Sequence, residues 1–302
     1  MLTALARLLG VSEFLWDDFL RMQYANLFPV VENVAALAEP RSKTGLTAEL
    51  AAALAAATDG PARRAALNAF KDREMFRIDM RHIMGHVADF GQFSAELTDL
   101  AEAVVAAAAD LSLTELRAQY GKPQADDGAA IPLAVCVLGK CGGYELGYAS
   151  DIEVMFIYGG PGQTTGPRVV SAAEFFDHLV TDFKTAIWAR REGIFEIDLD
   201  LRPYGAAGSL AVSFESVRRY FAPGGPAWPY ERQALIKLRA IAGAPAFGRQ
   251  IEALRDEFVY SPAAFDVAAM RAMRERQLRH LVTPGAINAK FSPGALVDVE
   301  YT

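Results

Sequence analysis

Acidic side chains recur at alternate positions in two short apolar segments of this sequence. Residues 151–154 read Asp-Ile-Glu-Val, and residues 196–202 read Glu-Ile-Asp-Leu-Asp-Leu-Arg. Because side chains alternate between the two faces of a β-strand, we expect Asp151 and Glu153 to share one face. Two carboxylates this close are unfavourable unless a cation neutralises them, and their oxygens suit a hard ion such as Mg²⁺. The first segment therefore predicts a divalent metal site.

The second acidic segment predicts the same geometry on another strand. Glu196, Asp198, Asp200 and Arg202 are expected on one face, with the intervening apolar residues on the other. If the two strands are neighbours, three or four carboxylates gather with an arginine at their rim. Metal-assisted phosphoryl or nucleotidyl transfer requires such a set, because metals bridge the phosphate oxygens and a cation offsets their charge. For Glu196 and Asp200, a surface role is an equally good interpretation.

A glycine-rich turn separates the first acidic segment from the apolar segment before it. Gly139, Gly142 and Gly143 follow residues 131–138, and Lys140 lies among them. Glycines allow backbone N–H groups to approach a triphosphate without a Cβ in the way. The turn therefore predicts a phosphate-binding loop, although Lys140 could equally be a surface lysine at a helix start.

The elements that must position these residues differ between the two halves of the chain. Residues 1–120 predict helices with almost no strand signal, and residues 121–128 form a turn-rich linker. After the linker, strands and helices mix, which predicts an α+β or α/β fold with one mixed sheet. The helix at 62–89 should carry a basic outer face, interleaved with acids as a salt-bridged surface. The predicted helices are 48–57, 62–89, 94–110, 114–120, 172–191, 213–220, 228–241, 244–258 and 263–281, and the predicted strands are 131–138, 152–158 and 193–201.

Composition restricts the class of protein. Of 302 residues, 52% are hydrophobic, which indicates a globular chain and excludes disorder as its main state. A net charge of −7 argues against a nucleic-acid partner, because such proteins normally carry a basic surplus. No apolar run is long enough to span a membrane, and only two cysteines are present, as is typical of a reducing compartment. We expect a cytoplasmic protein with neither a nucleic-acid nor a membrane partner.

The glycine turn and the acids together resemble a known signature. Gly139-Lys140, followed by ten residues and then Asp151 and Glu153, is similar to the signature of the DNA polymerase β nucleotidyltransferase superfamily. The longer string resembles the Gly-Lys-Leu-Gly-Gly-x-Glu-Leu and Ser-Asp-Ile-Asp pattern of the glutamine synthetase adenylyltransferase family, also called the adenylyl-removing enzyme. Further segments match this family in its order, and they are residues 70–78, 197–210 and 230–239.

The resemblance implies an architecture and a set of site residues. It implies a helical N-terminal region at 1–125, a polymerase-β-like nucleotidyltransferase core at 126–215 made of a small mixed sheet with flanking helices, and a helical region at 216–302. Asp151, Glu153 and Asp198 would be the catalytic residues and the ligands of two Mg²⁺ ions. The nucleotide, which is ATP or ADP with phosphate, would contact Gly139, Lys140, Gly142, Gly143, Ser150 and Arg202, and Arg202 could instead be architectural.

The resemblance also implies a reaction and its partners. Enzymes of the family have two related halves: one transfers AMP from ATP to a tyrosine of glutamine synthetase, and the other removes it by phosphorolysis. Only one half is present here, and residues 231–239 look slightly more like the adenylyl-removing one. Glutamine synthetase and a PII-type signal protein are the implied partners. Residues 288–302 resemble a motif that normally leads into another helical region, so we expect a fragment of a longer protein.

Three positions depart from the family pattern and leave alternatives open. Glu153 stands where the family usually has Asp, Cys141 where it has Leu, and Asp200 where it has Arg. An anion at 200 should weaken nucleotide binding or change how the metal is held. One alternative is therefore a degenerate nucleotide-binding regulatory module without turnover. Another is a nucleotidyltransferase that acts on RNA or a small molecule, and the acidic charge speaks against RNA.

Overall fold

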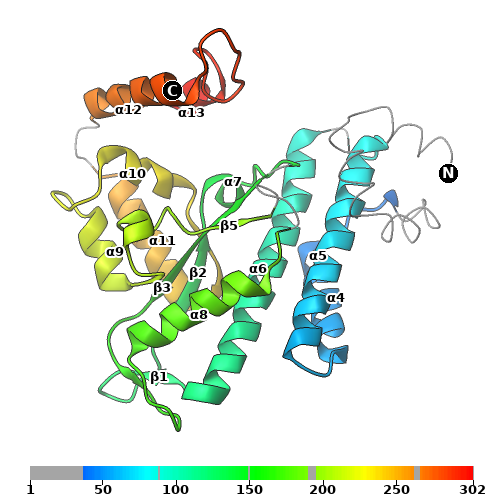
Figure 1. Ribbon diagram of the computed structural model, residues 1–302, viewed down its shortest axis with the longest axis vertical. Coiled ribbons are helices and arrows are strands. Elements are labelled where there is room, and N and C mark those ends of the chain that lie inside the picture. Colours follow the sequence, from blue (N-terminus) through cyan, green and yellow to red (C-terminus); the bar gives the residue numbers. More distant parts are fainter. Residues whose placement is uncertain (1–36, 88, 149, 190–194, 262–265, 302) are drawn as a thin grey trace.

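Three long helices come first in the part of the chain that the structure describes (Figure 1). A computed structural model describes residues 37–87, 89–148, 150–189, 195–261 and 266–301. Helices α4 (Lys43–Ala56), α5 (Gly60–Ile83) and α6 (Phe90–Tyr120) pack against one another, and α6 also contacts the sheet. The side chains of Ser42, Asp59 and Asp89 each accept a backbone N–H at the start of one helix. The predicted break between residues 110 and 114 is wrong, because Leu-Ser-Leu offers no glycine or proline to end α6.

Helix α5 buries basic side chains that were expected on an outer, solvent-facing side of the helix. Lys71, Arg77 and Arg81 are all buried, so that expectation is wrong. Arg81 donates to both carboxylate oxygens of Glu96 on α6, at 2.9 and 3.1 Å. The interleaved acids do pair with the bases, as predicted, but in the interior: Glu74 is buried and accepts from Arg77 of the same helix at 2.8 Å, because enclosed charges must find a partner.

A five-stranded mixed sheet forms the centre of the molecule. Its main path is β5 (Ile197–Asp198), β3 (Ile152–Tyr158), β2 (Leu133–Val137) and β7 (Arg239–Gly243), with β6 (Ala211–Ser213) pairing farther along β3. Strand β3 is parallel to β5 and β6 and antiparallel to β2, which is antiparallel to β7. A two-stranded sheet joins β1 (Pro123–Gln124) to β4 (Gln163–Thr164). The mixed sheet and the α+β class are thus as predicted.

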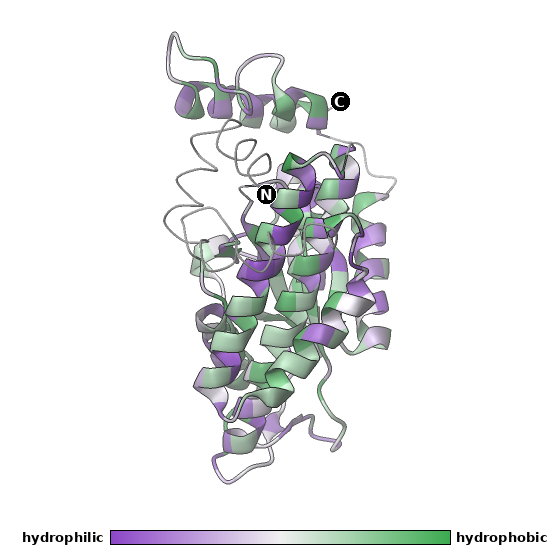
Figure 2. Ribbon diagram, turned by 90° about the vertical axis from the view of Figure 1, so that its right-hand side faces the viewer, coloured by the Kyte–Doolittle hydropathy of each residue, from purple (hydrophilic) through white to green (hydrophobic). Residues whose placement is uncertain are grey.

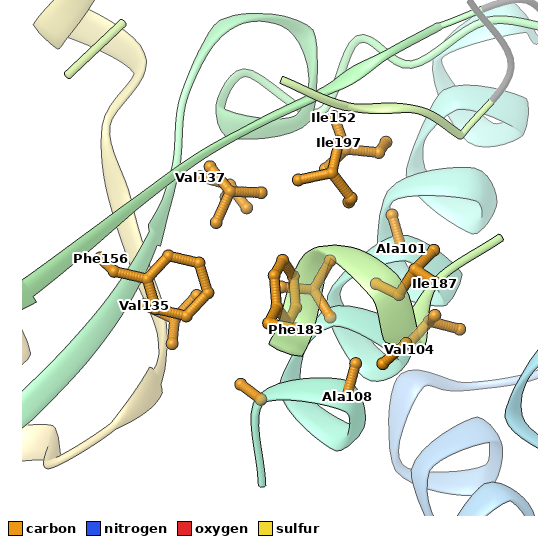
Figure 3. Packing of buried hydrophobic residues seen from close by; sticks show 14 of the residues in the cluster. Ala101, Val104, Ala108, Val135, Val137, Ile152, Phe156, Phe183, Ile187 and Ile197 are labelled. Carbon is orange, nitrogen blue, oxygen red and sulfur yellow. The ribbon is translucent and has the colours of Figure 1, made fainter. Parts of the chain in front are cut away.

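Helices cover both faces of the central sheet. Val135, Val137 and Phe156 face a core that is completed by α6 and by Phe183 and Ile187 at the end of α8 (Ala172–Ala186), as Figure 3 shows. The intervening strand residues face a second core under α9 (Phe214–Phe221) and α11 (Pro245–Val259). This strict alternation fixes which way each acidic side chain near the end of β3 can point.

Strand β7 replaces part of a predicted helix. Residues 228–241 were expected to be helical, but the helix α10 (Pro229–Ala234) and a 3₁₀ turn, η4 (Leu235–Lys237), end before Arg239. Residues 239–243 instead pair with β2, whose backbone groups would otherwise be left unpaired at a sheet edge. The prediction failed because that requirement comes from the tertiary fold.

Two further helices lie at one end of the molecule. α12 (Val267–Leu281) contacts α10, and it is followed by α13 (Leu296–Glu300). Both views place this pair beyond the sheet, and Figure 2 shows hydrophilic and hydrophobic residues alternating along it. Across the part of the chain described here, no helix is both long and apolar enough to cross a membrane.

Candidate active site

The two acidic segments lie side by side at one end of the sheet. Glu153 on β3 is in register with Asp198 on β5 in a parallel pair, and the backbone N–H of Ile152 donates to the carbonyl of Glu196 at 2.8 Å. Asp151 directly precedes β3. Ile152 and Ile197 both point into the core (Figure 3), so alternation turns Glu153 and Asp198 to the opposite face. The predicted adjacency of the two acidic strands is confirmed.

Glu153 is the most perturbed of these acids. Burial raises the pKa of its carboxyl to about 7, and the negative charges of Asp151 and Asp198 add to that rise. Its backbone hydrogen bond and the charge of Lys140 oppose the rise. The buried Oε2 atom accepts no hydrogen bond from the residues described. A buried, unpartnered carboxylate oxygen between two further acids is a place where a cation would be stabilised.

Gly139 brings the glycine turn against this carboxylate. Its φ of +51° is in the left-handed region, and a Cβ at this position would lie 2.6 Å from Glu153 Oε2. Both facts require glycine here. Gly142 has a different reason, because a Cβ there would collide with the carbonyl oxygen of Lys237. Gly139 therefore lets the turn pack against Glu153, and Gly142 lets it pack against Lys237 in η4.

Arg239 holds the far end of the same turn, the short helix α7 (Gly139–Gly142). Its guanidinium donates to the carbonyls of Gly142 at 2.7 Å and Cys141 at 3.0 Å, and it lies 4.3 Å above the ring of Tyr144. The same guanidinium pairs with Glu102 of α6, a buried acid that also pairs with Lys43 of α4. A chain of charges thus connects the N-terminal helices to the glycine turn.

A polar cavity of about 480 Å³ opens beside the acids. Asp151, Asp198 and Arg202 line it, whereas Glu153 and the glycine turn are not among its lining residues. Such a volume is within the range of small-molecule sites. Its remaining lining residues are Lys184, Glu196, Ile197, Leu199, Asp200, Ala206 and Leu210.

Known proteins match most of this chain. A model of the glutamate-ammonia ligase adenylyltransferase family matches residues 2–254. The chain belongs to the glutamate-ammonia ligase adenylyltransferase family. The family resemblance that the motifs suggested is therefore confirmed.

Curated relatives share one printed name, bifunctional glutamine synthetase adenylyltransferase/adenylyl-removing enzyme. The chain is 34% identical to that of Thioalkalivibrio sulfidiphilus over 278 residues, which are 88% of this chain and 28% of the relative. It is 33% identical to that of Aromatoleum aromaticum, over 86% of this chain and 29% of the relative. It is 28% identical to the relative from Shewanella woodyi, over 98% of this chain and 31% of the relative. The chain thus spans less than a third of the length of these relatives.

Arg202 and Asp200 depart from the strand geometry expected of them. Strand β5 ends at Asp198, so the alternation stops: Arg202 is buried and Leu201 is exposed. The Arg202 guanidinium donates to the carbonyls of Leu199 at 2.7 Å and Ser209 at 3.0 Å. Those bonds favour the architectural alternative. Asp200 lines the cavity, has a side chain 71% exposed and lies 3.5 Å from the Arg202 guanidinium.

Ser150 and Cys141 take structural positions in the adenylyltransferase fold. Ser150 is buried, its Oγ accepts the backbone N–H of Gly147 at 3.0 Å, and its carbonyl accepts the N–H of Phe195 at 2.9 Å. Those bonds tie the loop that precedes β3 to the chain that enters β5. Burial raises the pKa of the Cys141 thiol to about 12, so it is not a nucleophile near neutral pH.

The carboxylates of Asp151, Glu153 and Asp198 are chemically suited to a hard cation, but their side chains do not converge on one point. Within the described ranges, no three acidic, histidine or cysteine side chains converge closely enough to enclose a metal ion. One ligand candidate is engaged elsewhere: Asp198 Oδ1 accepts the N–H of Asp200 at 2.7 Å. The unpartnered Oε2 of Glu153 and the free second oxygen of a carboxylate such as Asp198 are oxygen donors of the kind that Mg²⁺ prefers.

Sequence reasoning missed three residues at this site. Lys184 lies on the polar side of α8 and lines the cavity, but nothing in its spacing distinguishes it from a surface lysine. Glu102 is a buried acid inside an alanine-rich helix. Its burial indicates a structural role only once its partner, Arg239, is known. Arg239 falls within residues 228–241, which the sequence predicted to be helical, and its contact with the glycine turn follows from strand β7.

Proposed function

We propose that this chain is a metal-dependent nucleotidyltransferase that moves AMP to or from a tyrosine of glutamine synthetase. The observation that supports the proposal best is the register of Glu153 with Asp198, next to a glycine turn that only glycine can make. The names of the relatives supply the protein substrate, glutamine synthetase. The geometry supports the reaction class, and the names of the relatives suggest the acceptor.

The acids and the glycine turn would have different roles in the reaction. Asp151, Glu153 and Asp198 would hold Mg²⁺, which when bound neutralises charge on the phosphate oxygens and orients them. Gly139 lets the turn pack directly against Glu153, and Lys140 and Lys184 supply nearby positive charge. In adenylylation, a bond forms from the tyrosine oxygen to the α-phosphorus and pyrophosphate leaves. In removal, a phosphate oxygen attacks the same phosphorus, the bond from phosphorus to the tyrosine oxygen breaks, and the products are ADP and the free tyrosine hydroxyl.

The architecture supports a polymerase-β-like core within this chain. The core would comprise residues 126–215, where the glycine turn, β3, α8 and β5 occur, between helical regions at 1–125 and 216–302. Strand β7 adds residues 239–243 to the same sheet. The catalytic unit would therefore depend on the C-terminal region for one strand and on the N-terminal helices for Glu102.

Transfer of radioactivity from α-labelled ATP to glutamine synthetase, with Mg²⁺ present, tests the proposal directly. Labelled glutamine synthetase after incubation with the chain would support it, as would release of labelled ADP from adenylylated glutamine synthetase in the presence of phosphate. Binding of Mg²⁺ and ATP with neither reaction would instead indicate a regulatory module. Labelling of an RNA or a small molecule alone would indicate another acceptor.

A further inference from the structure

A second cavity lies next to the acidic one and differs from it in character. Its volume is about 450 Å³, and Asp200 and Arg202 line both cavities. The other lining residues are mostly aromatic or small. They are Leu201, Tyr204, Gly205, Tyr220, Trp228, Glu231 and Ala234.

Aromatic rings are displayed to solvent around this second cavity. Tyr204 is 61% exposed and Trp228 is 59% exposed. Tyr204 has a φ of +65°, a backbone conformation that costs free energy for a residue with a Cβ and is retained most often where it serves a function. Solvent-exposed aromatic rings clustered at one place indicate a surface that another molecule covers, and Tyr and Trp are enriched at such surfaces.

The rings are held in place by contacts beneath them. The ring of Tyr220 packs edge-on against Tyr204 at 4.7 Å, and its hydroxyl donates to Glu231 at 2.6 Å. The ring of Trp228 is stacked on Tyr230, with centroids 6.2 Å apart and planes 11° apart. A fixed ring loses little side-chain entropy when it is covered, so this surface is prepared for binding.

The sheet order indicates which substrate would occupy this cavity. The glycine turn follows β2, which lies on one side of β3, and β5, with Asp198 and the start of the second cavity, lies on the other. Displacement at phosphorus is in line, so the attacking and leaving oxygens lie on opposite sides of the phosphorus. If the leaving phosphates occupy the glycine turn, the acceptor oxygen must come from the β5 side, where the aromatic cavity is.

We propose that the aromatic cavity, lined by Tyr204, Tyr220 and Trp228, binds the segment of the protein acceptor that carries the modified tyrosine. The proposal rests on the proposed function and specifies its acceptor site. The acceptor's tyrosine would extend past Asp200 toward Asp198, and its flanking residues would cover the two exposed rings. The same cavity would hold the modified segment when AMP is removed.

Two variants and one control test this proposal. Trp228→Ala removes one exposed ring, and Tyr204→Asn removes the other with a residue that tolerates the left-handed backbone. Tyr260→Ala is the matched control, because Tyr260 is 74% exposed and lines neither cavity. Thermal unfolding of each variant verifies the fold. The probe is unmodified glutamine synthetase, used both in labelled-ATP kinetics and in an equilibrium binding assay without nucleotide.

The cavity variants should raise the KM for glutamine synthetase about tenfold or more, with the KM for ATP within about twofold and the control unchanged. A larger KM for ATP with an unchanged KM for glutamine synthetase would assign the cavity to the nucleobase and overturn the proposal, as would no effect on either. If the wild-type chain transfers no AMP, the proposed function fails. The equilibrium binding assay with glutamine synthetase then tests the role of the cavity on its own. Weaker binding of glutamine synthetase by Trp228→Ala would still support the cavity, and unchanged binding would overturn it.

Discussion

Arg239 and Glu102 are 137 positions apart in the sequence, and they form an ion pair beneath the glycine turn. The same guanidinium donates to the carbonyls of Cys141 and Gly142, so it joins helix α6, strand β7 and the turn in one contact set. Glu102 is buried, and its second oxygen pairs with Lys43. The position of the turn therefore depends on helices that lie outside the predicted nucleotidyltransferase core.

Replacing Arg239 should loosen the turn without removing any acid. Arg239→Gln leaves a buried carboxylate and two carbonyls short of a donor, so we expect a loss of about 3 kcal/mol in the free energy of unfolding and a higher KM for ATP. Arg239→Lys should recover only part of that KM, because an ammonium cannot reproduce the planar fork. Chemical denaturation and ATP kinetics measure both effects.

The control for Arg239 is Arg218→Gln. Arg218 is exposed and pairs only within one turn of α9, with Glu215, so no measurable change in stability or in KM is expected. Full recovery of the ATP KM by Arg239→Lys would show that only positive charge is needed at that position.

Gly139 should tolerate no side chain. Gly139→Ala places a Cβ against the Glu153 carboxylate at a positive φ, so nucleotidyl transfer should fall at least about a hundredfold, because a small displacement of the reacting groups is costly. Initial rates with labelled ATP measure the loss.

Gly128→Ala separates backbone strain from contact. Gly128 has a φ of +83°, and nothing lies within 4 Å of the Cβ that would be added there. This control should lose about 1 kcal/mol of stability and keep its transfer rate. Equal losses of activity in the two variants would mean that contact with Glu153 is not the reason for Gly139.

Glu153 should make the stability of the metal-free protein decline as pH rises. Its pKa is raised to about 7 in the folded state, above the value of an unfolded glutamate, so between those values the native state binds more protons. Stability rises with pH only where the unfolded state binds more protons, so this carboxyl must lower the free energy of unfolding as pH rises from about 4.5 to about 7.

Glu153→Gln cannot ionise and should lose that decline. Denaturation curves of both proteins in a metal chelator, at several pH values, should agree at low pH, separate progressively as pH rises toward about 7, and keep a constant difference above that, with the variant the more stable. Parallel pH profiles for the two proteins would show that Glu153 is not buried as described.

The sequence predicted the strands β2 and β3, the glycine turn and the pairing of two acidic strands, because these depend on local spacing and alternation. It did not predict that Arg202 turns inward, since β5 ends at Asp198 for reasons of packing. The strand at 239–243 was taken for helix because the open edge of β2 exists only in the folded protein. The burial of Arg81 has the same origin, because its partner, Glu96, lies on another helix.

Asp198→Asn is the most direct test of the claim that acids on two neighbouring strands carry nucleotidyl transfer. An amide cannot hold Mg²⁺ comparably, so AMP transfer from labelled ATP to glutamine synthetase should fall at least about a thousandfold with the thermal unfolding temperature unchanged. The control Asp256→Asn changes an exposed acid that pairs with Arg255, and it should transfer AMP like wild type. Transfer by Asp198→Asn within about threefold of wild type would contradict the assignment of the site.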